Sequence, residues 1–218
     1  MDVALLQTIA LYAVPIVFAI TLHEAAHGYV ARIFGDQTAW MLGRVTLNPM
    51  RHIDPVGTVA VPLALVLMWK YLGGPGFLFG WAKPVPVNFA NLRNPKRHML
   101  WVAAAGPAAN LVMALGWAAL LRATDADGFA SGGLQRMAEG GVEINVALFV
   151  LNLLPIPPLD GGRIAVSLLP RRASAAYARL EPYGFLLVIV LLATGYLNVI
   201  MAPLLRVMES FLHLVTGV

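Results

Sequence analysis

The chain of 218 residues contains no cysteine and few charged side chains. Without cysteine it can form no disulfide, CxxC redox centre or thiolate metal site, so any metal must be bound by histidine or carboxylate ligands. Only 12% of its residues are Asp, Glu, Lys or Arg, against about 25% in typical soluble domains. Such a supply of charge is too small to cover the surface of a soluble protein of this length.

The chain is rich in apolar residues: 59% of its residues are hydrophobic and the mean hydropathy is +0.75. The net charge of +4 would suit a nucleic-acid partner, but the basic residues are scattered between apolar runs and form no patch with aromatics. We therefore expect no nucleic-acid partner. The composition predicts an all-α polytopic membrane protein, a single domain over residues 1–218 with four to six transmembrane helices in the lipid bilayer.

The expected spans follow from apolar runs near the length of about 20 residues that crosses the hydrocarbon. Three runs are long enough, and a fourth is slightly shorter. The apolar run that begins at residue 56 reaches Lys70 after only about 14 residues, so 56–72 is a re-entrant element or a short span. Residues 203–218 form either a span or an interfacial helix. The four main predicted spans are 5–30, 98–122, 142–169 and 183–199.

Lysine and arginine in short loops predict the orientation of these spans. If 56–72 does not cross, residues 31–97 lie on one side and hold most of the basic residues. The loop 123–141 then lies on the other side with Arg136 as its one basic residue, and the basic loop near 171–179 returns to the first side. This arrangement predicts that the N-terminus is outside and the basic loops are in the cytoplasm.

Between the first two main spans, the sequence favours extended structure. Residues 73–94 contain too many glycines and prolines for a helix. Pro84 and Pro86 allow an extended edge but not a central strand. Residues 43–48 alternate β-branched and other side chains, which is typical of a short strand. We expect a short extended or β, re-entrant region at the membrane face.

The motif His-Glu-Ala-Ala-His at residues 23–27 lies within the first predicted span. On a helix, His23 and His27 share a face, so both imidazoles can reach one metal ion. Glu24 lies beside them, within reach of a water held by that metal, which is the arrangement of a zinc hydrolase. Two histidines that merely pair with other helices are the alternative, but that requires burial of three polar groups within five residues of a span.

A catalytic zinc needs a third protein ligand. The downstream histidine of the pattern H-E-x-x-H-x-x-G-x-x-H is missing, because Val30 and Ile33 occupy the positions of its Gly and His. No glutamate follows Glu24 until Glu139, near the opposite face. The remaining intramembrane carboxylate is Asp160.

Asp160 follows three prolines, Pro155, Pro157 and Pro158, that must interrupt the helix within the membrane. Unwound backbone is tolerated at that depth only where it faces protein or a wet cavity. A carboxylate at such a break is a candidate metal ligand or proton relay. Asp160 and the two histidines reach the same depth only if their spans run in the same direction, so a single crossing, 98–122, should separate them.

These motifs resemble those of the site-2 proteases, the intramembrane zinc metalloproteases, and in particular compact prokaryotic members without PDZ or CBS domains. The resemblance covers most of the chain. It rests on the motif at residues 23–27, on Gly-Pro-Ala-Ala-Asn at 106–110, and on the segment from Asn152 to Leu-Asp-Gly at 159–161. It implies one Zn²⁺ per chain held by His23, His27 and Asp160, with Glu24 as the general base.

The resemblance also implies that Asn152 holds the substrate strand or the oxyanion, with Asn110 and His52 as further candidates. Packing is the alternative role for Asn110. His52 and Asp54 either line the site or are ordinary interfacial polar residues, and the same two alternatives apply to Lys83 and Asn88, which lie in the region that suits a substrate edge. The expected location is a prokaryotic inner membrane, with the active site toward the cytoplasm.

The predicted reaction is hydrolysis of peptide bonds in or near transmembrane segments of membrane-protein substrates, that is, regulated intramembrane proteolysis. The alternative is a metal-ion or proton transporter that uses the same His/Asp cluster, because ionisable residues in spans also mark ion pathways. Glu24 distinguishes the two, since a transporter needs no base beside its metal. The sequence does not identify the substrate or the oligomeric state.

Overall fold

A computed structural model describes residues 3–72, 80–127 and 132–217. Regular structure within these ranges is entirely helical, which confirms the all-α prediction. Short helical turns, η1 (Pro49–Arg51), η2 (Pro55–Ala60) and η3 (Phe89–Asn91), connect the longer elements. The α-helices are α1 (Val3–Ile33), α2 (Thr38–Met41), α3 (Val61–Leu72), α4 (Pro95–Asp127), α5 (Gly132–Leu153), α6 (Asp160–Leu168), α7 (Arg171–Ala178), α8 (Glu181–Ala193) and α9 (Tyr196–Thr216).

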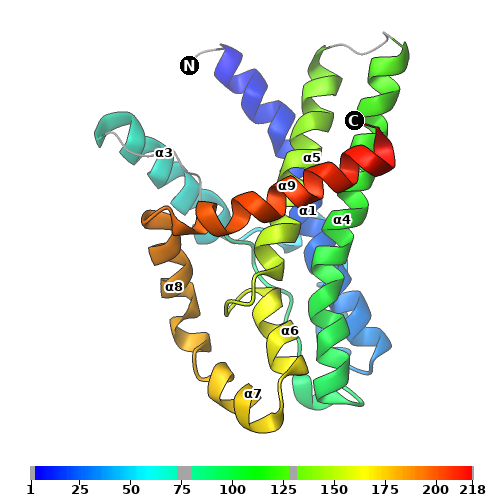
Figure 1. The fold of residues 1–218 in the computed structure, drawn as a ribbon, viewed down its shortest axis with the longest axis vertical. Helices are drawn as coiled ribbons and strands as arrows, with labels where there is room; N and C mark the ends of the chain where they lie inside the picture. Colours follow the sequence, from blue (N-terminus) through cyan, green and yellow to red (C-terminus); the bar gives the residue numbers. More distant parts are fainter. Residues whose placement is uncertain (1–2, 73–79, 128–131, 218) are drawn as a thin grey trace.

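Helices α1, α4 and α5 pack against one another and form the centre of the molecule (Figure 1). The helix α4 runs in the opposite direction to α1 and α5 (Figure 1). Two apolar clusters hold this bundle: Ala31 of α1 packs with Met99 and Val102 of α4, while Ala114 of α4 packs with Val146 of α5. The histidine motif of α1 and the chain that follows α5 therefore approach α4 from parallel helices, as the depth argument predicts.

The predicted break near residue 155 divides the third span into α5 and α6. Helix α5 ends at Leu153 and α6 begins at Asp160, because the prolines between them lack the N–H groups that a continuous helix needs. Gly161 allows the loop to fold back: a Cβ there would lie 2.3 Å from the carbonyl oxygens of Leu153 and Leu154. Asp160 is thereby placed in the first turn of a new helix.

The predicted span 183–199 is divided between two helices, α8 and α9. Helix α8 stops at Ala193, and Gly195, with φ of 77°, turns the chain into α9. This left-handed backbone conformation is accessible mainly to glycine, so the helix cannot continue through it. Helix α9 crosses α5 and α4 (Figure 1) and packs Leu212 into their shared cluster.

Two helices are long and apolar enough to cross a membrane within the described part of the chain: Pro95–Thr124 and Tyr196–Thr216. The first contains the predicted span 98–122. The bent pair α7 and α8, at 63° to each other, would be a third if it counts as one span. The chain thus has membrane-spanning helices, while the predicted count of four to six is not confirmed. Residues 55–72 form η2 and α3, and α3 points away from the bundle (Figure 1).

The predicted short strand over 43–48 was wrong: no β-strand occurs within 3–72, 80–127 or 132–217. Residues 80–88 have no regular structure, and residues 73–79 lie outside the described ranges. Pro84 and Pro86 remove N–H donors from this segment, so it does not pair with a neighbouring strand. Its remaining donors bond to loops and side chains instead: the N–H of Trp81 donates to Gly57 O (3.0 Å) and that of Lys83 to His52 O (2.9 Å).

Candidate metal centre

Three side chains from α1 and α6 converge against α4. The Nε2 atoms of His23 and His27 lie 3.1 Å apart. Oδ2 of Asp160 lies 3.1 Å from Nε2 of His23 and 3.2 Å from Nε2 of His27. All three residues are buried, with 6–8% of their surface exposed. Two ligands thus come from consecutive turns of one helix, and the third comes from a helix that begins more than 130 residues later.

Hydrogen bonds behind the two imidazoles determine which ring nitrogens face this cluster. Nδ1 of His23 donates to Oδ1 of Asn110 (2.5 Å), and Nδ1 of His27 donates to the carbonyl oxygen of Val102 (2.7 Å). Both oxygens can only accept, so a neutral ring carries its proton on Nδ1 and presents a lone pair at Nε2. Two imidazole lone pairs and a carboxylate oxygen that has no hydrogen-bond donor therefore face one another. A cation between them resolves the repulsion.

The spacing and chemistry of these atoms fit zinc. A tetrahedral site with bonds of about 2.0–2.1 Å has ligand atoms about 3.3–3.4 Å apart, close to the separations of 3.1–3.2 Å observed here. Two imidazole nitrogens and one carboxylate oxygen are a common zinc donor set. Gly106 of α4 keeps the space open, because a Cβ there would lie 2.4 Å from Nε2 of His27.

Glu24 lies beside the ligands and is held by the segment 80–88. Its Oε2 accepts a 2.7 Å hydrogen bond from the main-chain N–H of Val85. Val85 is buried against α1 at Gly28, where a Cβ would lie 3.1 Å from Cγ1 of Val85. Gly28 therefore lets this segment lie close enough to reach the carboxylate.

Comparisons with known proteins show the family to which the chain belongs. A family model described as Peptidase family M50 matches residues 126–195. The chain is 36% identical over 211 residues, 94% of its length, to the "Putative zinc metalloprotease YwhC" of Bacillus subtilis (strain 168), of which it covers 90%. The chain belongs to peptidase family M50, the site-2 proteases. It is a zinc metalloprotease and an integral membrane protein.

Two longer proteins are also similar to the chain. The "Putative zinc metalloprotease Rip2" of Mycolicibacterium smegmatis is 36% identical over 183 residues, and that of Mycobacterium tuberculosis (strain ATCC 25618 / H37Rv) is 30% identical over 184 residues. Each match covers 83% of this chain and 65% of the relative, so the chain spans about two thirds of their length. No solved structure matches the chain.

The other candidate site residues, Asn110, Asn152 and His52, lie in three different environments. Asn110 is fully buried behind His23. Asn152 lies at the end of α5, where its Nδ2 donates to Leu148 O of the same helix (3.0 Å). His52 does not join the ligand cluster. It is 1% exposed, and its Nε2 lies 3.0 Å from the carbonyl oxygen of Thr46.

The remaining polar residues of the region hold the loops together. Asp54 caps η2 by accepting from the N–H groups of Val56 (3.0 Å) and Gly57 (2.7 Å). Asn88 caps η3 through its side chain, and its own N–H donates to Asp36 (2.6 Å). In this structure, the main-chain donors of Lys83 and Asn88 are used inside the protein.

Two features of the site were missed by sequence reasoning. Asn145 of α5, 0% exposed, accepts from Nδ2 of Asn110 at 3.0 Å. Arg44, 8% exposed, donates from Nη2 to Lys83 O at 2.7 Å, next to the residues that hold Glu24. A buried amide within the third predicted span was a signal for Asn145, because polar side chains in spans are rare. Arg44 lies in a loop, where an arginine is common and gives no sign of burial.

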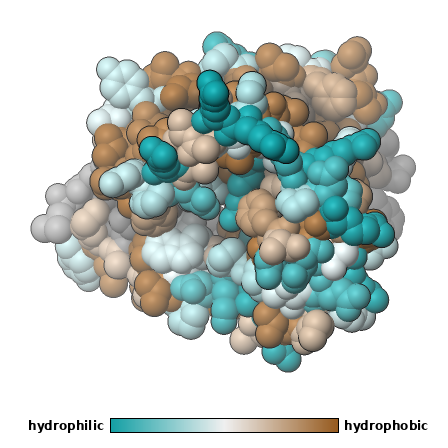
Figure 2. All heavy atoms as spheres, turned by 90° about the horizontal axis from the view of Figure 1, so that it is seen from below, coloured by the Kyte–Doolittle hydropathy of each residue, from teal (hydrophilic) through white to brown (hydrophobic). Residues whose placement is uncertain are grey.

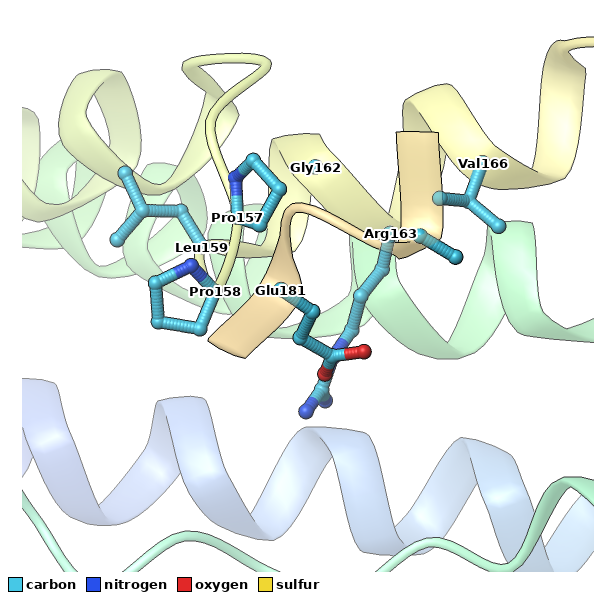
Figure 3. A pocket seen from close by; sticks show the side chains of 8 residues that line it. Pro157, Pro158, Leu159, Gly162, Arg163, Val166 and Glu181 are labelled. Carbon is cyan, nitrogen blue, oxygen red and sulfur yellow. The ribbon is translucent and has the colours of Figure 1, made fainter. Parts of the chain in front are cut away.

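A small cavity lies beside the loop that precedes Asp160 (Figure 3). Its volume is about 20 Å³, which is room for about one water molecule. Pro157 and Pro158 of the loop, Arg163 of α6 and Glu181 of α8 border it (Figure 3). A peptide does not fit this cavity, so it is not the substrate cleft.

Proposed function

We propose that the protein is an intramembrane endopeptidase that hydrolyses peptide bonds in or near transmembrane segments of membrane-protein substrates. The observation that carries this proposal is the position of Glu24, a carboxylate that adjoins a buried His/His/Asp cluster and is held there by a main-chain donor. The cluster packs against α4, a helix long and apolar enough to span the bilayer. Metal-dependent hydrolysis of a peptide bond needs both a metal site and a base beside it.

Each side chain has a separate task in this reaction. His23, His27 and Asp160 would hold the zinc ion, which would supply Lewis acidity and lower the pKa of a water molecule at the site. Glu24 accepts the proton of the attacking water and transfers it to the leaving amine. Asn152 is our candidate for the oxyanion or the substrate strand, a task for which its amide must exchange the bond to Leu148.

The substrate must be unwound before it is cut, because a helix hides its carbonyl groups in backbone hydrogen bonds. A transmembrane segment that reaches the site from the lipid therefore has to extend locally. The loop between α5 and α6 offers the polar backbone along which water can enter an otherwise apolar bundle. We expect substrates with weak helical propensity near the cleavage site.

We further propose that the site lies toward the cytoplasm of a prokaryotic inner membrane. Exposed basic residues of α7 and of the first turn of α4 lie at one end of the molecule (Figure 1), and hydrophilic side chains cover much of that end (Figure 2). Basic loops stay in the cytoplasm. The helix α1 runs toward this end, so its N-terminus would be outside (Figure 1).

The direct test compares the wild type with Glu24→Gln in detergent or liposomes. A reporter peptide with one transmembrane segment is the substrate, and bound zinc is quantified in both proteins. We expect zinc in both and cleavage only by the wild type, because Gln keeps the shape but cannot accept the proton. Glu139→Gln is the matched control, since Glu139 is exposed on α5, and it should cleave normally.

Two outcomes would reject the proposal. A wild type that holds zinc but never cleaves any membrane reporter is not an endopeptidase. Zinc uptake into proteoliposomes that is equal for the wild type and Glu24→Gln would favour the transporter instead. Activity that survives Asp160→Ala would show that another residue is the third ligand.

A further inference from the structure

We propose that Asn145 is a positioning residue that acts through Asn110 to keep His23 in the tautomer that binds zinc. The inference rests on the zinc site of the proposed function. It concerns a residue whose side chain bonds to Asn110 and Gly141, so that its effect on His23 passes through the amide of Asn110.

The observation is a continuous polar chain in an apolar bundle. Gly141 O accepts from Nδ2 of Asn145 (2.8 Å), and Oδ1 of Asn145 accepts from Nδ2 of Asn110 (3.0 Å). Oδ1 of Asn110 then accepts from Nδ1 of His23 (2.5 Å). Both asparagines are 0% exposed, and they lie on α4 and α5, which pack against each other. The chain runs from a main-chain carbonyl of α5 to a metal-ligand side chain of α1.

Each hydrogen bond in this series has a fixed donor and acceptor, and the carbonyl of Gly141 determines the first of them. A carbonyl oxygen only accepts, so Asn145 must turn its NH₂ group toward Gly141 and its oxygen toward Asn110. That oxygen requires the NH₂ group of Asn110, which leaves only the oxygen of Asn110 to face His23. Ala19 O accepts from the same NH₂ group at a longer 3.4 Å. Asn145 therefore sets the orientation of Asn110.

The orientation of Asn110 decides the tautomer of His23. With the amide oxygen facing Nδ1, the ring proton stays on Nδ1 and the lone pair of Nε2 faces the metal position. A flipped amide would turn its NH₂ group toward Nδ1 and favour a proton on Nε2, which opposes metal binding. Partners behind metal-binding histidines typically contribute 10- to 100-fold to metal affinity.

The central variant is Asn145→Leu, which has a similar volume and no acceptor for Asn110. Zinc affinity is measured on the full-length protein in detergent, by competition with a chromophoric chelator. We expect affinity to fall by about 10- to 100-fold. In Asn145→Asp an acceptor for Asn110 remains, so this variant should bind zinc at least as tightly as the wild type.

A double variant distinguishes a hydrogen-bond relay, the series from Gly141 through Asn145 and Asn110 to His23, from a packing role of Asn145. In Asn110→Asp/Asn145→Leu, either carboxylate oxygen can accept from Nδ1 of His23, so no second residue is needed to orient it. We expect this protein to recover most of the zinc affinity that Asn145→Leu loses. A purely structural role for Asn145 predicts no recovery, because the leucine is still present.

Nitrogen NMR of metal-free protein with labelled histidine provides a readout that is independent of activity. The resonances of His23 are assigned by their loss in His23→Ala. Asn145→Leu should show a smaller fraction of His23 with a protonated Nδ1 and a bare Nε2 than the wild type does. If Asn145→Leu does not fold, Asn145→Ala removes the same acceptor and replaces it in both measurements.

The inference is overturned if Asn145→Leu binds zinc within about twofold of the wild type, or if the double variant is no better than Asn145→Leu. Its failure is distinguishable from that of the proposed function. A wild type that binds zinc but cuts no reporter rejects the protease proposal and leaves the relay standing. Unchanged zinc affinity in Asn145→Leu, with reporter cleavage intact, rejects the relay alone.

Discussion

The main-chain N–H of Val85 donates a 2.7 Å hydrogen bond to Oε2 of Glu24. This contact joins the helix that carries the candidate ligands His23 and His27 to a residue 61 positions after Glu24. Arg44 supports the segment on its other side by donating from Nη2 to Lys83 O (2.7 Å) and Pro84 O (3.3 Å). The bond occupies one carboxylate oxygen, so it can hold the base while Oε1 accepts a proton.

Val85→Pro should therefore lower kcat and leave zinc content unchanged. Proline removes the N–H donor but keeps an apolar side chain. Hydrogen bonds to charged groups contribute about 1.5–3 kcal/mol, so kcat should fall by roughly 10- to 150-fold with little change in KM. Reporter cleavage with zinc quantification checks this. Val85→Ala, which keeps the N–H, should retain most of the activity, and a wild-type kcat for Val85→Pro would disprove the role of the bond.

Gly106→Ala should abolish zinc binding. Its Cβ would lie 2.4 Å from Nε2 of His27 and 2.6 Å from Nε2 of His23, so the imidazoles would have to move away from the metal position. Gly116→Ala in the same helix is the control, because no atom lies within 4 Å of a Cβ at that position. Zinc quantification in both purified proteins decides the matter, and normal zinc in Gly106→Ala would contradict the site geometry.

Removal of zinc should lower the thermal stability of the wild type. The lone pairs of three ligands repel one another without a cation, and a ligand at 100 times its Kd stabilises the folded state by about 2.7 kcal/mol. Unfolding in detergent is followed by circular dichroism with excess zinc and with chelator. His23→Ala, which lacks one ligand, should show a much smaller difference between the two conditions. Equal zinc responses in the two proteins would argue against binding at this cluster.

Asp36 should make the stability of the loop region depend on pH. Burial raises the pKa of its carboxyl, but hydrogen bonds from Thr38, Asn88 and Asn91 outweigh burial and hold the pKa below 3.8. A lowered pKa in the folded state means that the stabilisation is complete above the unfolded pKa and is lost as pH falls through the folded value. The wild type should therefore lose stability in strong acid.

The comparison with Asp36→Asn isolates this contribution. We expect the variant to be less stable at neutral pH by about 1–3 kcal/mol, because one oxygen that accepts hydrogen bonds becomes an NH₂ group. The difference from the wild type should begin to shrink below the unfolded pKa of about 4, where the unfolded chain takes up the proton, and should be lost as the pH falls through the lower folded pKa. Thermal unfolding of both proteins over this pH range provides the measurement. A difference that is constant with pH would exclude the carboxylate as its source.

The residues of the candidate metal site could be predicted from the sequence because their relation is local or chemically restricted. His23 and His27 share a helix face because residues four positions apart on an α-helix lie on the same side. Asp160 followed from the scarcity of intramembrane carboxylates and from a proline break that the structure confirms between α5 and α6. Helical periodicity and the cost of buried charge act within one segment or on one residue, so no knowledge of packing was needed.

Only the tertiary structure decided the contacts that orient these residues. The bonds of Asn145 to Asn110 and of Val85 to Glu24 join segments 35 and 61 residues apart, and side-chain identity alone does not say which buried donor meets which acceptor. The same holds for the missing strand over 43–48, where loop contacts replaced strand pairing. The sequence by itself determined which side chains can bind zinc, since that is a property of their chemistry and local spacing. Packing of α1, α4 and α5 against one another determined how those side chains are held, since hydrogen-bond direction depends on positions that distant helices set together.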